Sequence, residues 1–231
     1  SYTGERESLE TVQKLAGAVK AGLGTEPVEK SEEKLTCTKK NEGFKTSGQV
    51  QYVARTGNFV KKGFTYTGAL EILKVALSYD YLWLNIRVKG GAYGCMSGFY
   101  RNGDMYMVSY RDPNLKETND IFEHAADYVE NFNVSDRDMV KFIIGTIGDM
   151  DTPMNPSTKG DRSMAAYLQD ITYEELQQER DQVIGAQAQD IRNLKDLIAS
   201  VLDENNLCVI GNEGVLQEQK EMFFELKHLN A

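Results

Sequence analysis

A long helical pattern that ends at two consecutive glycines limits how this chain can fold. Residues 67–89 carry apolar side chains at the three- and four-residue spacing of a helix with one buried face. Thr67 is suited to cap the first turn, and Gly90 and Gly91 are suited to end the last one. We therefore expect a largely buried helix that leads directly into the next element. Its apolar positions are Leu70, Leu73, Ala76, Leu77, Tyr81, Leu82, Trp83 and Leu84.

Two strand-like segments follow this helix. Residues 93–100 and 105–110 are rich in strand-forming side chains, and Asn102-Gly103 lies between them. An Asn-Gly pair between two such segments is a strong hairpin signal, because both residues accept the positive φ angles of a tight turn. The sequence therefore predicts an antiparallel hairpin directly after the helix.

Helical and strand patterns are mixed through the rest of the chain. A length of 231 residues suits one large domain or two small ones. We interpret the chain as a single α+β domain, with a mixed β-sheet and helices packed mainly on one face. Further helices are expected over residues 7–22, 116–132, 135–147, 159–170 and 172–203 and after Gly214, and further strands over 44–46, 50–54 and 207–210.

The composition excludes several classes of partner. Asp and Glu outnumber Lys and Arg by 35 to 26, which gives a formal net charge of −9. Nucleic-acid-binding proteins need a basic surface, so we expect no nucleic-acid partner. No apolar run approaches the ~18–20 residues of a membrane span, so we expect no membrane partner. Three widely spaced cysteines, Cys37, Cys95 and Cys208, favour reduced thiols over a disulfide framework.

Few side chains could hold a metal or act as a nucleophile. The two histidines, His124 and His228, lie far apart in the sequence and belong to no zinc-binding motif. No serine occupies a Gly-x-Ser-x-Gly motif, and Cys95 and Ser97 lie in a predicted strand without an evident histidine partner. We therefore expect no metal site in this chain, and strand packing as the ordinary role of Cys95 and Ser97.

The glycines of residues 90–94 do not predict a phosphate site. Phosphate-binding loops precede a helix, whose first N–H groups bind the anion. Here the glycines follow a helix and precede a strand. A nucleotide-binding enzyme is therefore disfavoured.

Arg87 and Tyr93 lie on either side of these glycines and admit two interpretations. A guanidinium and a phenol hydroxyl could both donate to one oxygen that gains negative charge in a reaction. Losing one such donor typically costs about 100- to 1,000-fold in rate. Alternatively, Arg87 neutralises the end of the helix, for about 0.3–1 kcal/mol, and Tyr93 packs in the sheet. Residue chemistry alone favours this second interpretation.

The sequence around these two residues resembles the last domain of presequence proteases, a branch of the pitrilysin/insulinase zinc metallopeptidases. The most specific segment is Tyr-Leu-Trp-Leu-Asn-Ile-Arg-Val-Lys-Gly-Gly-Ala-Tyr-Gly at residues 81–94. The resemblance extends over nearly the whole chain. Its other segments are residues 51–57, 109–115, 142–147, 151–153, 171–180 and 208–213.

The resemblance implies that residues 1–231 are the C-terminal domain of a longer zinc metalloendopeptidase, and a first residue that is Ser1 suggests an excised piece. Family members enclose short unstructured peptides between two halves and bind zinc through His-x-x-Glu-His in their first domain. The last domain contributes an arginine and a tyrosine, here Arg87 and Tyr93, which contact the scissile carbonyl. This chain has no His-x-x-Glu-His. It would therefore be inactive alone and would depend on the other domains of its polypeptide for zinc.

Two expectations accompany this resemblance. The alternative function is a non-catalytic structural or binding module that keeps the peptidase fold, although such a module has no use for both Arg87 and Tyr93. Because no targeting leader opens the chain, we also expect a bacterial cytosolic protein.

Overall fold

The computed structural model describes residues 2–27, 38 and 40–229. The chain separates into two compact units. The first consists of Ser1–Cys37 and Asp151–Gln177, and the second of Thr38–Met150 and Gln178–Ala231. The α+β class is confirmed, and the sheet with its covering helices belongs to the second unit. Cys95 and Cys208 are free thiols, whereas Cys37 lies outside the described residues.

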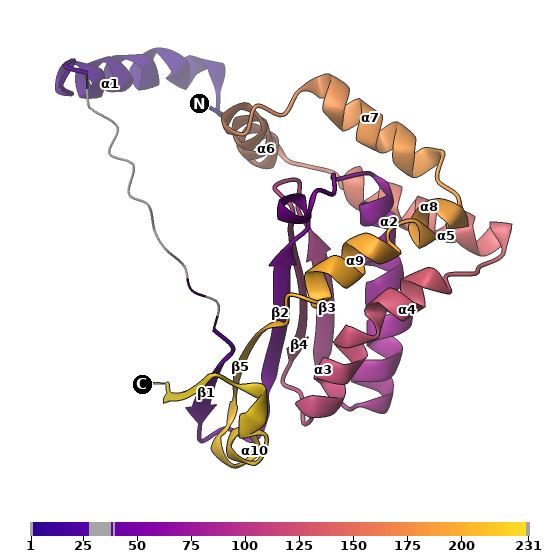
Figure 1. Cartoon of the computed structure of the whole chain (residues 1–231). Coiled ribbons are helices and arrows are strands. Elements are labelled where there is room, and N and C mark those ends of the chain that lie inside the picture. The colour runs from indigo at the N-terminus through magenta and orange to yellow at the C-terminus, as the bar shows by residue number, and fades with distance from the viewer. Residues whose placement is uncertain (1, 28–37, 39, 230–231) are drawn as a thin grey trace. The chain divides into compact units, whose positions relative to one another are not determined.

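The second unit is built on a six-stranded mixed sheet (Figure 1). The strand order is β3-β4-β2-β5-β1-β6. β1 runs parallel to both of its neighbours, and the remaining pairs are antiparallel. The bounds are β1 Glu42–Thr46, β2 Tyr52–Asn58, β3 Gly94–Phe99, β4 Asp104–Tyr110, β5 Asn206–Asn212 and β6 Glu225–His228.

The predicted hairpin is confirmed. β3 and β4 pair from Gly94 opposite Tyr110 to Phe99 opposite Met105. Gly103 takes a φ of 92° in the turn, which a glycine adopts without strain. A Cβ on this residue would also meet the side chain of Val60 at 2.6 Å.

The predicted helix over residues 67–89 forms, but its second half has π-helical winding. It consists of α2 (Ala69–Ala76) and η3 (Leu77–Lys89). Its N-cap is Gly68 rather than Thr67, and the Gln182 side chain accepts the Gly68 N–H at 2.7 Å. A π-helix has more residues per turn than an α-helix. The buried positions of η3 are therefore Leu77, Leu82 and Ile86, and Leu84 and Trp83 are exposed, contrary to the predicted stripe.

The sheet has one covered face and one open face. On β2 and β4 the buried side chains alternate with more exposed ones, as one-sided packing requires. Figure 1 shows α2, α3, α4 and α9 gathered along one side of the strands, which agrees with the predicted packing on one face. The bounds are α3 Lys116–Glu123, α4 Ala125–Glu130, α5 Asp136–Met150, α8 Ala188–Arg192, α9 Lys195–Leu202 and α10 Glu213–Glu218.

The single helix predicted over residues 172–203 was wrong. α7 (Tyr173–Ile184) ends before Gly185, and two shorter helices, α8 and α9, follow. Gln187 and Asp190 form a capping box that starts α8. This break directs α9 back onto β2, where Ile198 and Val201 are buried.

Two further predictions need correction. The helix expected over residues 116–132 is interrupted at His124, where α3 ends and α4 begins. The last helix expected after Gly214 is only α10, and the chain then forms a short 3₁₀ turn, η4 (Lys220–Met222), and strand β6. β6 pairs with β1, and Lys227 reaches Glu42 across that pair.

The first unit contains η1 (Arg6–Ser8), α1 (Leu9–Ala21) and α6 (Pro156–Leu168). The predicted helices at 7–22 and 159–170 are thus confirmed. The Asn155 side chain caps α6 by accepting the Thr158 N–H. α1 has no buried residue, and Leu15 is 63% exposed.

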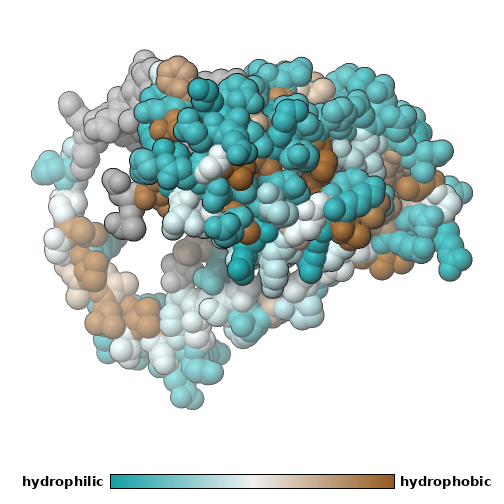
Figure 2. Space-filling model, turned by 90° about the horizontal axis from the view of Figure 1, so that it is seen from below, coloured by the Kyte–Doolittle hydropathy of each residue, from teal (hydrophilic) through white to brown (hydrophobic). Residues whose placement is uncertain are grey.

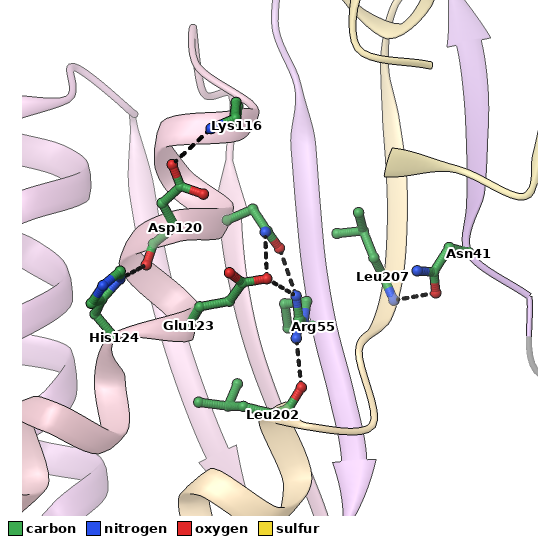
Figure 3. A network of polar contacts seen from close by, with 9 residues as sticks. Asn41, Arg55, Lys116, Asp120, Glu123, His124, Leu202 and Leu207 are labelled. Atoms are coloured by element: carbon green, nitrogen blue, oxygen red, sulfur yellow. Dashed lines mark hydrogen bonds and ion pairs between the residues drawn. The ribbon is translucent and has the colours of Figure 1, made fainter. Parts of the chain in front are cut away.

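A buried arginine connects the sheet to the helices that cover it (Figure 3). Arg55 of β2 is 3% exposed, and its Nη1 donates to Asn119 Oδ1 and Glu123 Oε1, both at 2.9 Å. Its Nη2 donates to the Leu202 carbonyl oxygen at 2.8 Å. These bonds attach α3 and the end of α9 to β2, so one guanidinium fixes how two helices lie on the sheet.

Polar side chains dominate the face of the molecule seen in Figure 2, with hydrophobic residues in small groups between them. This agrees with a charged fraction of 26%. Among the described residues, no helix combines the length and the apolar character that crossing a membrane requires.

Replacing Arg55 should weaken the second unit. We expect Arg55→Ala to lower the free energy of unfolding by about 3 kcal/mol, because it leaves the buried Leu202 carbonyl and Asn119 amide without their donor. Glu123→Gln should cost less than about 1 kcal/mol, since the Glu123 side chain is 45% exposed. Urea unfolding of both variants measures the difference, and equal losses would contradict this account.

Candidate functional site

The last turn of η3 presents Arg87 on an aromatic support. The guanidinium carbon lies 4.0 Å from the centre of the Trp83 ring, a close cation–π contact. Arg87 is half-buried, and its side chain makes no hydrogen bond or ion pair with any described residue. Its donors are therefore oriented by Trp83 and remain available to a ligand.

The turn after η3 brings Tyr93 beside Arg87. Gly91 has a φ of 82°, and its N–H donates to the Arg87 carbonyl, which ends the helix with a left-handed residue. The Asn114 side chain donates to the Gly90 carbonyl at 2.7 Å. The Tyr93 N–H then donates to the Arg111 carbonyl at 3.3 Å. These contacts place the Arg87 guanidinium 5.8 Å from the Tyr93 ring centre.

Tyr93 begins a row of tyrosines on the open face of the sheet. Its ring meets Tyr110 edge to face at 5.7 Å, and Tyr110 meets Tyr52 in the same way at 5.4 Å. Tyr93 is 64% exposed, and its hydroxyl has no partner among the described residues. The ring thus packs at the sheet edge, as the second interpretation required, while the hydroxyl group stays free.

A buried carboxyl group holds the segment behind the site. Asp112 is fully buried, accepts the Thr118 hydroxyl at 2.7 Å and accepts the Asn114 N–H at 2.9 Å. Its own N–H and carbonyl pair with the backbone of Gln51. Asp112 therefore ties the end of β4 to α3 and to the loop that precedes β2.

The site contains a second arginine close to Tyr93. Arg111 is exposed, and its guanidinium carbon lies 5.9 Å from the Tyr93 ring centre. Among residues 2–27, 38 and 40–229, no carboxylate forms an ion pair with Arg87 or Arg111. This leaves two arginines and a phenol hydroxyl able to bind an electron-rich oxygen.

Cys95 lies near this cluster but is not an activated nucleophile. Burial raises the pKa of the Cys95 thiol to about 11, although the nearby Arg87 charge opposes that shift. Thiolates are the nucleophilic form, so a thiol with this pKa is inert near neutral pH. Ser97 is buried in β3 next to Ser78, with 3.4 Å between the two hydroxyl oxygens. Both residues therefore have the packing role predicted for them.

The histidines lie away from the site. The His124 ring nitrogen Nδ1 is 2.7 Å from the Asp120 carbonyl oxygen, a contact that raises the pKa of the imidazole. His228 belongs to the edge strand β6. In the described part of the chain, no three His, Cys, Asp or Glu side chains gather as a metal site would require. The residues present thus do not fit a zinc ion.

The family model described as the PreP C-terminal domain matches residues 41–213. That range covers most of the chain and includes Arg87, Tyr93 and Arg111. The chain belongs to the PreP C-terminal domain family. The resemblance to presequence proteases is thereby confirmed, while the roles of Arg87 and Tyr93 stay predictions.

Curated relatives of this family member are much longer than the chain. Protein HypA of Clostridium perfringens is 41% identical over 98% of the chain, which covers 23% of that protein. Presequence protease 1 of Arabidopsis thaliana, chloroplastic/mitochondrial, is 31% identical over 81% of the chain, which covers 18% of that protein. The chain thus spans about a fifth of the length of these relatives.

Solved structures share the fold of this PreP C-terminal domain. A peptidase M16 inactive domain from Pseudomonas fluorescens matches 88% of the chain and 50% of its own, with a TM-score of 0.60 and 15% identity. Pitrilysin matches 96% of the chain and 25% of its own, with a TM-score of 0.60 and 12% identity. At these identities the likeness shows the fold alone.

The expectation of a bacterial cytosolic protein is overturned by these relatives. HypA is clostridial, whereas the Arabidopsis presequence protease is chloroplastic and mitochondrial. These relatives therefore do not assign a compartment to this chain.

Two residues of the site were missed in the sequence. Trp83 was counted in the buried stripe, although its spacing of four residues from Arg87 is typical of side chains that meet on a helix. Arg111 lies in one of the segments that resemble the family, but no local pattern marks its conformation. Its φ of 50° is left-handed, which is uncommon for a residue other than glycine or asparagine.

The left-handed φ of Arg111 predicts that this residue lowers the free energy of unfolding. Arg111→Gly should raise the free energy of unfolding by about 0.5–1 kcal/mol, because glycine accepts a left-handed φ without a Cβ clash. The control is Lys61→Gly in the 3₁₀ turn η2 (Val60–Lys62), which should destabilise slightly. Urea unfolding compares the two, and a loss of stability at Arg111 would show that its side chain has a structural role.

Proposed function

We propose that this chain is the C-terminal domain of a zinc metalloendopeptidase that hydrolyses short unstructured peptides. In this proposal the guanidinium of Arg87 and the hydroxyl of Tyr93 donate hydrogen bonds to the scissile carbonyl oxygen and to the oxyanion that forms from it. Membership of the PreP C-terminal domain family supports the reaction class. The residues of this chain would act toward a zinc site on another domain of the longer polypeptide.

One observation carries the assignment of roles. Two strong donors, both without a partner among the described residues, lie on the two sides of one short turn with 5.8 Å between guanidinium carbon and ring centre. Donors that are oriented before the reaction stabilise a developing negative charge without a reorganisation cost. Trp83 fixes the guanidinium, and Tyr110 fixes the phenol ring.

A peptide would have to lie between this domain and the zinc-binding one. Catalysis would then depend on the enclosure of the substrate, which removes water from the scissile bond and strengthens the two hydrogen bonds. The exposure of Tyr93 in the domain alone is consistent with a residue that acts on a neighbour.

The alternative is a non-catalytic module that keeps the fold. The fold alone does not distinguish it from the first proposal, because a domain described as a peptidase M16 inactive domain shares that fold. The two proposals differ in one measurable respect, because only the first makes turnover depend on Arg87 and Tyr93.

Substitution of the two donors tests the proposal in the full-length protein. We expect Arg87→Ala and Tyr93→Phe each to lower kcat on a fluorogenic peptide by about 100- to 1,000-fold, because each removes one oxyanion donor. The free energy of unfolding of the 231-residue chain should change by less than about 1 kcal/mol. Tyr79→Phe on η3, where the tyrosine is also exposed, is the matched control. Wild-type turnover in either test variant would contradict the oxyanion-donor role proposed for that residue.

Metal removal gives a second test. A chelator should abolish peptide hydrolysis by the full-length protein but leave the Tm of the 231-residue chain unchanged, because a ligand stabilises only the domain that binds it. Differential scanning fluorimetry of the chain, with and without added zinc, measures this directly. A zinc-dependent rise in Tm with one ion bound per chain would contradict the placement of zinc on another domain.

A further inference from the structure

Arg111 is an exposed cation beside the two proposed oxyanion donors. It follows the last residue of β4, and its carbonyl accepts the Tyr93 N–H at 3.3 Å. Its guanidinium carbon is 5.9 Å from the Tyr93 ring centre, and that of Arg87 is 5.8 Å from the same point. The two guanidinium groups are therefore no more than about 12 Å apart.

The backbone of Arg111 is held in an unfavourable conformation. Its φ of 50° is left-handed, which costs an arginine more than a glycine. The next residue, Asp112, is fully buried and bonded to Thr118 and Asn114, which fixes this conformation. Such strain in a non-glycine residue is typical of functional positions.

No described carboxylate neutralises Arg111, in a chain with a large excess of acids. Other cations of this unit, such as Lys45, Arg55 and Lys195, pair with a glutamate. The acid nearest to Arg111 in sequence is Asp112, whose carboxyl oxygens instead accept from Thr118 and Asn114. The site is thus locally cationic although the whole chain carries a net charge of −9.

We propose that Arg111 is a specificity-determining residue that binds a carboxylate of the substrate peptide close to the scissile bond. This inference rests on the proposed function. The guanidinium fork matches a carboxylate with two parallel hydrogen bonds, and carboxylates are the anionic groups of an unmodified peptide. An extended chain advances about 3.3 Å per residue, so a carbonyl at Arg87 and Tyr93 puts groups up to about three residues away within reach.

The carboxylate has two possible sources, a side chain of Asp or Glu or the C-terminal carboxylate. Both present the same chemistry to Arg111. Four peptides of otherwise identical sequence separate them: Glu or Gln within three residues of the scissile bond, each with a free or an amidated C-terminus.

The kinetic test uses the full-length protein with these peptides. Arg111→Ala should reduce the preference in kcat/KM for the carboxylate-bearing peptide by about ten-fold or more, mainly through KM. Arg111→Lys should keep part of this preference, because lysine retains the positive charge but lacks the paired N–H donors of a guanidinium. Lys61→Ala removes a charge at the opposite end of β4, where Asn58 pairs with Asp104, and should leave the preference unchanged.

Each outcome of this test has a defined meaning. If Arg111→Ala loses only the preference for Glu over Gln, the bound carboxylate belongs to a side chain. If it loses only the preference for a free over an amidated terminus, the bound group is the C-terminal carboxylate. Wild-type enzyme with no preference in either comparison overturns the proposal. So does Arg111→Ala with an equal fall for all four peptides, since that indicates a structural role.

A binding test without catalysis separates this inference from the proposed function. Trp83 is the one tryptophan of the sequence and lies against Arg87, so its fluorescence reports on ligands at this site. Titration of the 231-residue chain with the four peptides should give a Kd about ten-fold lower with the bound carboxylate than without it, in the Glu–Gln or in the free–amidated comparison. Arg111→Ala should remove that difference. If full-length Arg87 and Tyr93 variants keep their turnover while this difference persists, the oxyanion roles fail and the carboxylate site stands. Equal Kd values in both comparisons, Glu against Gln and free against amidated terminus, on the wild-type chain overturn it.

Discussion

The buried carboxyl group of Asp112 holds together the segments that carry the candidate site. It accepts from Thr118 on α3 and from the Asn114 N–H, and the Asn114 side chain in turn donates to the carbonyl of Gly90 at the end of η3. Three elements that meet at this edge of the sheet are therefore joined through one fully buried group. Buried polar groups are costly unless all their bonds are made, and a fully bonded network specifies one arrangement. The relation of Arg87, Tyr93 and Arg111 to one another depends on this arrangement.

The residues behind the site are held by hydrogen bonds, whereas the donor groups of the site itself have no partner among the described residues. Asp112 and Gln51 are buried and bonded, whereas Tyr93 is exposed and its hydroxyl has no partner among the described residues. A rigid scaffold that presents unpaired donors is suited to bind a ligand whose geometry is fixed in advance. A helix that merely ended at the sheet would need neither Trp83 beneath Arg87 nor Arg111 in a left-handed conformation.

Local signals predicted the elements that are stabilised locally. The hairpin of β3 and β4 follows from Asn102-Gly103, and the helix from Ala69 to Lys89 follows from its apolar repeat. β6 was missed because its stability comes from parallel pairing with β1, a partner about 180 residues earlier, and from the Lys227–Glu42 ion pair. The π winding of η3 was missed because the repeat of three and four residues assumes an α-helix, and it places Trp83 at the surface. The residues Arg87 and Tyr93 were found through resemblance, since their chemistry alone favoured an ordinary helix end.

The energetic cost of the site bears on the choice between an enzyme domain and an inert scaffold. Fold stability in this unit comes from the covered face of the sheet, where Val53, Met107 and Ile198 are fully buried and Arg55 is hydrogen-bonded to α3 and α9. Arg111 forms no ion pair with a described carboxylate, and its left-handed φ is unfavourable for that stability. Residues whose backbone conformation is unfavourable and does not stabilise the fold are concentrated at functional sites. A scaffold that needed only the fold could replace Arg111 by glycine without a loss of stability. The left-handed Arg111 beside Arg87 and Tyr93 is therefore consistent with the ligand-binding role proposed for this turn.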